Sequence, residues 1–140
     1  MKLRHLLPSL ALLLAACATD ADRAAPALPA EGKTYLVFFS FDKSDITPEA
    51  EETIGQAAAD AKKSGAHIVL AGHADSAGSS DYNRRLSESR AVAVRAALVR
   101  AGVAESAIQA VGEGEGRRRT PIVDGIRERR VEISLFSAGL

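Results

Sequence analysis

The chain has one cysteine, one methionine and no tryptophan among its 140 residues, and its only aromatic residues are two tyrosines and four phenylalanines. A single thiol has no partner for an internal disulfide. So few aromatic rings offer few stacking platforms for single-stranded nucleic acid, and we expect no nucleic-acid partner. The formal net charge of zero is too small to direct the molecule to a charged surface.

The length allows one folded domain of ordinary size and leaves no room for a second. Hydrophobic residues make up 46% of the chain and charged residues 26%, which is typical of a globular protein. Much of the apolar share is alanine, which buries little area per residue. We therefore expect a thin, closely packed core.

Residues 1–16 have the pattern of a secretory signal. Lys2 and Arg4 form a basic start, and the apolar run after them is too short to span a bilayer as a mature helix. The run ends in the tetrapeptide LAAC, which closes at Cys17 and resembles the bacterial lipobox. This resemblance implies cleavage before Cys17 and its lipidation with acyl chains such as palmitate. The alternative is an incidental cysteine in an ordinary cleaved signal.

Residues 17–32 comprise the expected lipidation site and a flexible tether. The segment is rich in alanine and proline, has no apolar periodicity, and would reach about 50 Å if fully extended. Ala18 stands where an aspartate is associated, in well-studied enteric bacteria, with retention in the inner membrane. We therefore predict attachment to the outer membrane and a folded domain over 33–140 in the periplasm.

Four strands and two helices are predicted in this domain. The run KTYLVFFSF over 33–41 is apolar on both of its alternating faces, so we expect a strand that is buried on both sides. Thr47 and Pro48 start a helix that stops at Gly65, and a second helix runs from about residue 81 to Gly102. Further strands are expected over 66–72, 107–112 and 130–136.

The predicted order, βαβαββ, indicates an α+β or α/β sandwich. Strands joined by helices need right-handed crossovers, so the first three strands belong to one sheet with both helices packed on one face. The last strand must then join the sheet with mixed polarity. We expect a mixed four-stranded sheet with two main helices on one side.

Arg90 occupies an unexpected position in the second helix. At 100° per residue it lies about 40° from Leu86, within the apolar stripe that includes Val94 and Ala97. A guanidinium on the sheet-facing side is too costly to leave unpaired, so it needs an anion or must extend past the start of the helix. Helical side chains lean toward the N-terminus, which directs Arg90 toward the loop that carries Asp75.

Two interpretations of this arginine follow from the residues. In the first, Arg90 forms an internal salt bridge with Asp75 or Asp81 that fixes the loop. In the second, Asp75 and Arg90 are two halves of a site for a zwitterion: the carboxylate binds an ammonium and the guanidinium binds a carboxylate. Amides at the start of the helix would add to the anion site. An α-amino acid centre carries both charges side by side.

Three segments resemble, in order and spacing, the OmpA-like peptidoglycan-binding domain. They read FFSFDKSDI over 38–46, GHADSAGSSDYNRRLSESRA over 72–91, and GIRERRVEI over 125–133. The resemblance extends from about Tyr35 to Phe136, and with the lipobox the whole chain resembles the peptidoglycan-associated lipoproteins. It implies an OmpA-like fold and non-covalent, non-catalytic binding of the diaminopimelate side chain of the peptide stem.

The resemblance also implies which residues form the site. Asp75 and Arg90 match the principal ligand-binding aspartate and arginine, and Asp42, Asn83 and Arg129 match supporting positions of the same pocket. The chain departs from the usual residues of the family at three nearby positions: Ala74, Ala77 and Glu128.

No enzyme, metal or cofactor is expected. His73 and Asp75 are spaced like two metal ligands, but a metal site needs three or four, and no oriented catalytic dyad is visible. We therefore expect an outer-membrane lipoprotein that binds peptidoglycan and tethers the membrane to the wall. One alternative is an envelope-complex subunit that chiefly docks a Tol-system protein, and another is a wall-cleaving enzyme.

Overall fold

The computed structural model describes residues 32–115 and 128–137. The expected signal sequence, Cys17 and nearly all of the expected tether lie outside the described residues, as do 116–127 and 138–140. The predicted domain limits and the lipidation of Cys17 therefore remain predictions.

The predicted βαβαββ order is confirmed. In chain order the elements are β1 (Thr34–Phe38), α1 (Pro48–Ser64), β2 (His67–Gly72), α2 (Ser80–Arg100), the 3₁₀ helix η1 (Glu105–Ala107), β3 (Ile108–Gly112) and β4 (Arg130–Phe136). The side chain of Thr47 caps α1 by accepting a hydrogen bond from the backbone nitrogen of Ala50 at 3.2 Å. Gly65 ends α1 in the left-handed conformation that glycine adopts readily, with a φ of 64°.

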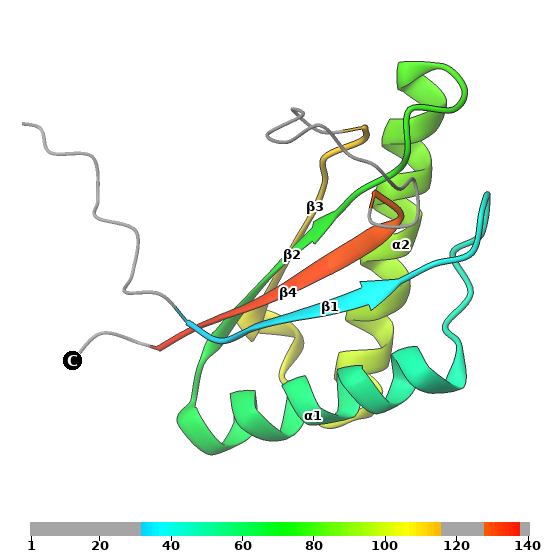
Figure 1. The fold of residues 1–140 in the computed structure, drawn as a ribbon. Helices are drawn as coiled ribbons and strands as arrows, with labels where there is room; N and C mark the ends of the chain where they lie inside the picture. Colours follow the sequence, from blue (N-terminus) through cyan, green and yellow to red (C-terminus); the bar gives the residue numbers. More distant parts are fainter. Residues whose placement is uncertain (1–31, 116–127, 138–140) are drawn as a thin grey trace, which may run out of the picture.

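The four strands form one mixed sheet in the order β1-β4-β2-β3. Strand β2 runs parallel to β3, whereas β4 runs antiparallel to both of its neighbours, β1 and β2. The last strand of the chain therefore lies in the interior of the sheet (Figure 1). Its three core-facing residues, Val131, Ile133 and Leu135, are all buried, as an interior strand requires.

Both helices cover the same face of this sheet (Figure 1), as predicted: α1 packs on β1, and α2 packs on β2 and β3. Alanines at the α1 interface let that helix approach the sheet closely, and they pack with the larger core residues Val37, Ile54, Ile68, Leu70, Val94, Leu98 and Ile133. Within the described ranges, neither helix has the length and hydropathy needed to cross a membrane.

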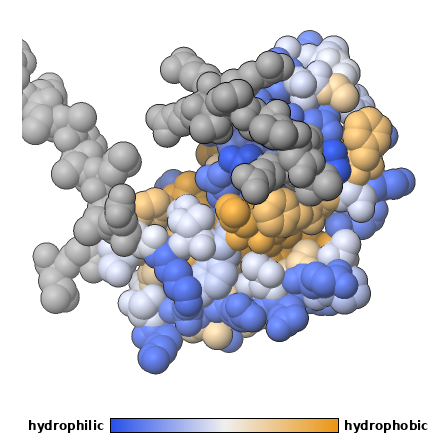
Figure 2. Space-filling model, in the orientation of Figure 1, coloured by the Kyte–Doolittle hydropathy of each residue, from blue (hydrophilic) through white to orange (hydrophobic). Residues whose placement is uncertain are grey.

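The first strand is shorter than predicted and is buried on one face only. Leu36 and Phe38 are 43% and 44% exposed, because the helices pack on the opposite face of β1. The chain leaves the sheet after Phe38, and Phe41 is 61% exposed. The prediction of a strand buried on both sides was wrong, and apolar surface remains on this side of the molecule (Figure 2).

Candidate ligand-binding site

The predicted site residues gather at one end of the sheet, where β1 and β2 end and where β4 and α2 begin (Figure 1). Asp42 lies in the turn after β1, Asp75 follows β2, and Arg129 immediately precedes β4. Asn83 and Arg90 lie on α2. Residues separated by up to 87 positions in the sequence are thus brought to one edge by the topology.

Arg90 is fully buried, and its guanidinium binds three backbone carbonyls. Nε donates to the carbonyl oxygen of Lys43 at 2.8 Å, Nη1 to that of His73 at 2.9 Å, and Nη2 to that of Ser40 at 3.1 Å. The ring of Phe39 lies 5.3 Å from its Cζ atom. Burial lowers the pKa of Arg90, but a guanidinium stays charged in proteins. Arg90 therefore joins α2 to the ends of both β1 and β2.

The structure does not support an internal bridge between Arg90 and an aspartate. Across the described part of the chain, Arg90 forms no ion pair with Asp75 or Asp81. The negative charge of Asp75 raises the pKa of Arg90 and so offsets part of the lowering that burial causes. The carbonyls satisfy the buried cation instead, and they use three of its five N–H donors. Among the described residues, one N–H on each terminal nitrogen has no partner.

Arg129 is the cation that pairs with Asp75. Its Nη1 lies 3.4 Å from Oδ2 of Asp75, and its Nε donates to the carbonyl oxygen of Phe39 at 3.3 Å. The two side chains of the pair are 18% and 15% exposed. Oδ1 of Asp75 accepts a hydrogen bond from the backbone nitrogen of Ala77 at 3.2 Å, which orients the carboxylate. Both contacts of Arg129 are longer than those of Arg90, so Arg129 is held less tightly.

Asp42 contacts a residue that the sequence analysis did not identify. Its Oδ1 accepts a hydrogen bond from the hydroxyl of Tyr82, in the first turn of α2. This hydrogen bond raises the pKa of Tyr82. The signal that could have revealed Tyr82 is its position beside Asn83, at the start of a helix whose N-terminus was already expected to border the site.

Asn83 is 1% exposed and faces the segment after β3. Its Nδ2 donates to Oε2 of Glu115 at 3.3 Å, and Ser80 donates to Oε1 of the same carboxylate at 3.1 Å. Oδ1 of Asn83 is buried and has no hydrogen-bond partner among the described residues. Buried acceptors are rarely left unsatisfied, so this oxygen is an unusual feature of the site.

Four of the five predicted residues form one electrostatic group. Asp75, Arg129 and Asp42 all act on the charge of Arg90, whereas Asn83 hydrogen-bonds toward Glu115 on a neighbouring segment. Two carboxylates and two guanidiniums at one edge suit a ligand with both an ammonium and a carboxylate. The described residues contain no cluster of three or more His, Cys, Asp or Glu side chains that could hold a metal ion.

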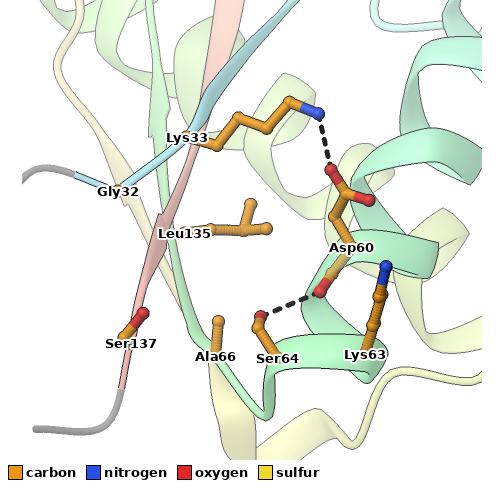
Figure 3. A pocket seen from close by; sticks show the side chains of 8 residues that line it. All are labelled: Gly32, Lys33, Asp60, Lys63, Ser64, Ala66, Leu135 and Ser137. Carbon is orange, nitrogen blue, oxygen red and sulfur yellow. Dashed lines mark hydrogen bonds and ion pairs between the residues drawn. The ribbon is translucent and has the colours of Figure 1, made fainter.

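A separate recess of about 400 Å³ lies at the opposite end of the sheet (Figure 3). It is lined by the start of β1, the end of α1 and the end of β4. Nζ of Lys33 points to Asp60 across the recess and lies 2.6 Å from its Oδ2. The hydrogen bond between them raises the pKa of Lys33 and lowers that of Asp60. The Lys33–Asp60 contact is shorter than the 3.4 Å contact between Arg129 and Asp75, so the charges of this recess are less available to a ligand than those of the Asp75 edge.

Comparison with known families agrees with this arrangement. The profile described as the OmpA family matches residues 38–131, which is more than half of the chain. The chain belongs to the OmpA family. The match begins in β1 and ends in β4, so it includes all five predicted site residues.

Individual relatives are similar over the same region. The peptidoglycan-associated lipoprotein of Pseudomonas aeruginosa is 39% identical over 102 residues, which cover 69% of this chain and 59% of that protein. An outer membrane protein of Gluconacetobacter diazotrophicus is 38% identical over 117 residues, covering 76% of this chain and 31% of that protein. The chain thus spans at most about three fifths of the length of these relatives.

Solved structures share the fold. The crystal structure of the peptidoglycan-associated lipoprotein from Burkholderia pseudomallei superimposes with a TM-score of 0.67 at 30% identity, and the match covers 72% of this chain and 89% of that one. The expected OmpA-like fold, a mixed four-stranded sheet with two helices on one face, is confirmed.

Proposed function

We propose that this protein binds the diaminopimelate-containing peptide stem of peptidoglycan without covalent bond or catalysis. The observation that carries the proposal is the ion pair of Asp75 and Arg129 at one end of the sheet, beside the fixed guanidinium of Arg90. The names of the relatives support it, since the similar proteins from Pseudomonas and Burkholderia are peptidoglycan-associated lipoproteins.

Binding would proceed by exchange of partners at Asp75. The free end of diaminopimelate carries an ammonium and a carboxylate on one carbon. The ammonium replaces Arg129 at Asp75, and Arg129 then faces the ligand carboxylate, with the buried positive charge of Arg90 behind the site. The ion pair is long, at 3.4 Å, and the incoming ammonium takes the place of the cation that leaves, so Asp75 keeps a cationic partner throughout the exchange.

The proposed location is the periplasmic side of the outer membrane. A lipid on Cys17 would anchor the chain there, and the expected tether over 17–32 would let the domain reach a wall within about 50 Å. One weak contact per molecule is enough for such a tether, because many copies act together along the polymer.

The test is co-sedimentation of the full-length chain, kept in detergent, with purified sacculi. Wild-type protein should pellet with diaminopimelate-type sacculi and much less with lysine-type sacculi, whose free side chain lacks the carboxylate. Asp75→Asn should remove the binding. Asp60→Asn, which changes a carboxylate in the opposite recess, should leave it intact. Full binding by a folded Asp75→Asn variant would show that the site is elsewhere.

A second candidate function, docking of a Tol-system protein, is favoured by the apolar residues exposed along and after β1. Leu36, Phe38 and Phe41 are between 43% and 61% exposed. Such side chains on a periplasmic domain suit a protein partner. Tol-protein capture that persists in Asp75→Asn and is lost in Phe38→Ser would favour docking as a separate role.

A further inference from the structure

The turn that carries Asp42 has an unusual backbone and several restraints. Asp42 has a φ of 56°, a left-handed conformation that aspartate and asparagine tolerate better than most side chains. Two nearby residues, Ser40 and Lys43, both give their carbonyls to Arg90. The backbone nitrogen of Lys43 also donates to the carbonyl of Ser40 at 3.2 Å. The backbone of this turn is therefore fixed without help from Tyr82.

The hydroxyl of Tyr82 adds a restraint on the side chain alone. It donates to Oδ1 of Asp42, so one carboxylate oxygen is occupied. No hydrogen bond joins Oδ2 to any residue of 32–115 or 128–137. Tyr82 is 41% exposed, and Asp42 is exposed as well, so this contact adds little to the stability of the fold. Its effect is to limit the orientations of an acidic side chain at the edge of the site.

We propose that Tyr82 is a positioning residue for ligand binding: it holds Oδ1 of Asp42 so that Oδ2 remains directed to a ligand ammonium. This inference rests on the proposed function, because the ammonium is that of the peptide stem. The segments that carry Asp42 and Asp75 both give backbone carbonyls to Arg90, so both carboxylates lie near one guanidinium. With its side chain oriented by Tyr82, Asp42 would bind the ligand ammonium together with Asp75.

The charges around Tyr82 suit this role. Asp42 faces it from the turn after β1, and Arg90 and Arg85 act on it from its own helix. The hydrogen bond to Asp42 raises the pKa of Tyr82 more than the charges of the two arginines lower it, so the pKa lies above its ordinary value of 10.0. The hydroxyl therefore remains a hydrogen-bond donor throughout the neutral range.

The chain provides a matched control for the test. Its only other tyrosine, Tyr35, also donates its hydroxyl to an aspartate, Asp60, but at the opposite recess. Affinity for a soluble diaminopimelate-containing stem peptide is measured by calorimetry on the full-length chain in detergent. Tyr82→Phe should weaken binding by about threefold to tenfold, because the ligand must then order the freed Asp42 side chain. Tyr35→Phe should leave it unchanged.

The double variant decides whether Tyr82 acts through Asp42. Asp42→Asn keeps a side chain that tolerates the positive φ and should weaken binding at least as much as Tyr82→Phe. Adding Tyr82→Phe to Asp42→Asn should then cost nothing further. Unchanged affinity in Tyr82→Phe, or losses that simply multiply in the double variant, would overturn the inference.

A titration without ligand separates this inference from the proposed function. In a Tyr35→Phe background Tyr82 is the only tyrosine, and the chain has no tryptophan, so its ionisation can be followed by ultraviolet absorbance. The pKa of Tyr82 should be raised and should fall in Asp42→Asn. If this shift is seen but wild-type protein binds no stem peptide, the proposed function fails while the contact stands. If there is no shift, the positioning role fails whatever the ligand.

Discussion

The guanidinium of Arg90 donates to the backbone carbonyl of His73 at 2.9 Å, two residues before Asp75, and forms no ion pair with the Asp75 carboxylate. Arg90 is thereby a fixed part of the scaffold, whereas Arg129 is the cation that contacts Asp75. The two arginines should therefore respond differently to substitution, one chiefly in stability and the other chiefly in binding.

Arg90→Lys should destabilise the domain by about 3 kcal/mol. A single ammonium cannot reach three carbonyls in the directions that the guanidinium spans, so buried carbonyls of Ser40, Lys43 or His73 lose their donor. Urea unfolding followed by circular dichroism measures the change in the free energy of unfolding. Arg85→Lys, at an exposed position on the same helix, should change it by less than about 0.5 kcal/mol. Equal stabilities of the two variants would contradict the scaffold role.

Arg129→Gln should weaken ligand binding more than it lowers stability. Its contacts to Asp75 and to the carbonyl of Phe39 are long, at 3.4 and 3.3 Å, so the loss of stability should be smaller than that of Arg90→Lys. Binding to diaminopimelate-type sacculi should be strongly reduced, because the ligand carboxylate loses the cation that leaves Asp75 to contact it, Arg129. The comparison is Arg84→Gln, which breaks the exposed pair with Glu88 on α2 and should bind normally. A destabilised Arg129→Gln that still binds would reverse the assigned roles.

The face of α2 on which Arg90 lies could be predicted from the sequence, because periodicity along one helix depends only on local spacing. The partners of its guanidinium could not be predicted in this way. The carbonyls of Ser40 and Lys43 lie 50 and 47 residues earlier and become neighbours of Arg90 only when the turn after β1 meets α2 in the folded domain. Of the two interpretations that the sequence left open, the internal salt bridge of Arg90 is not found among the described residues, because backbone carbonyls satisfy the guanidinium instead.

The same long-range effects explain the misjudged first strand. The run over 35–41 is apolar except for Ser40, so little in the local sequence marks the end of the strand at Phe38. Beyond it, the carbonyls of Phe39, Ser40 and Lys43 accept hydrogen bonds from the side chains of Arg129 and Arg90, which lie far away in the sequence. The central position of β4 likewise depends on pairing across the whole domain and has no local signal.

Gly72→Ala should destabilise the domain by at least about 3 kcal/mol and displace α2 from the sheet. A Cβ atom at Gly72 would lie 2.1 Å from the carbonyl oxygen of Ser87, so the backbone of α2 would have to move. Gly55→Ala is the control, because its Cβ meets nothing within 4 Å on the exposed side of α1. That change should stabilise the protein by about 0.5 to 1 kcal/mol. Thermal unfolding of both variants checks the contrast.

His73 links stability to pH. Its side chain is 17% exposed, and Nε2 lies 3.8 Å from Oε1 of Glu132 without a hydrogen bond. Burial and the nearby charge of Arg130 lower the pKa of His73, and the charges of Glu132 and Glu113 oppose them only in part. The folded protein therefore favours the neutral ring, whereas the unfolded chain takes up a proton near the ordinary pKa of 6.5.

The free energy of unfolding should consequently fall as the pH drops below about 6.5. The contribution of His73 should level off once the pH is below the pKa of His73 in the folded protein. His73→Gln removes the titrating ring and should flatten this part of the curve. His67→Gln, at an exposed position at the start of β2, should leave the slope as it is in the wild type. Urea unfolding at a series of pH values between about 8 and 5 measures the slopes. If His73→Gln keeps the wild-type slope, another group must bind the proton, and the neutral state assigned to His73 in the folded domain would be wrong.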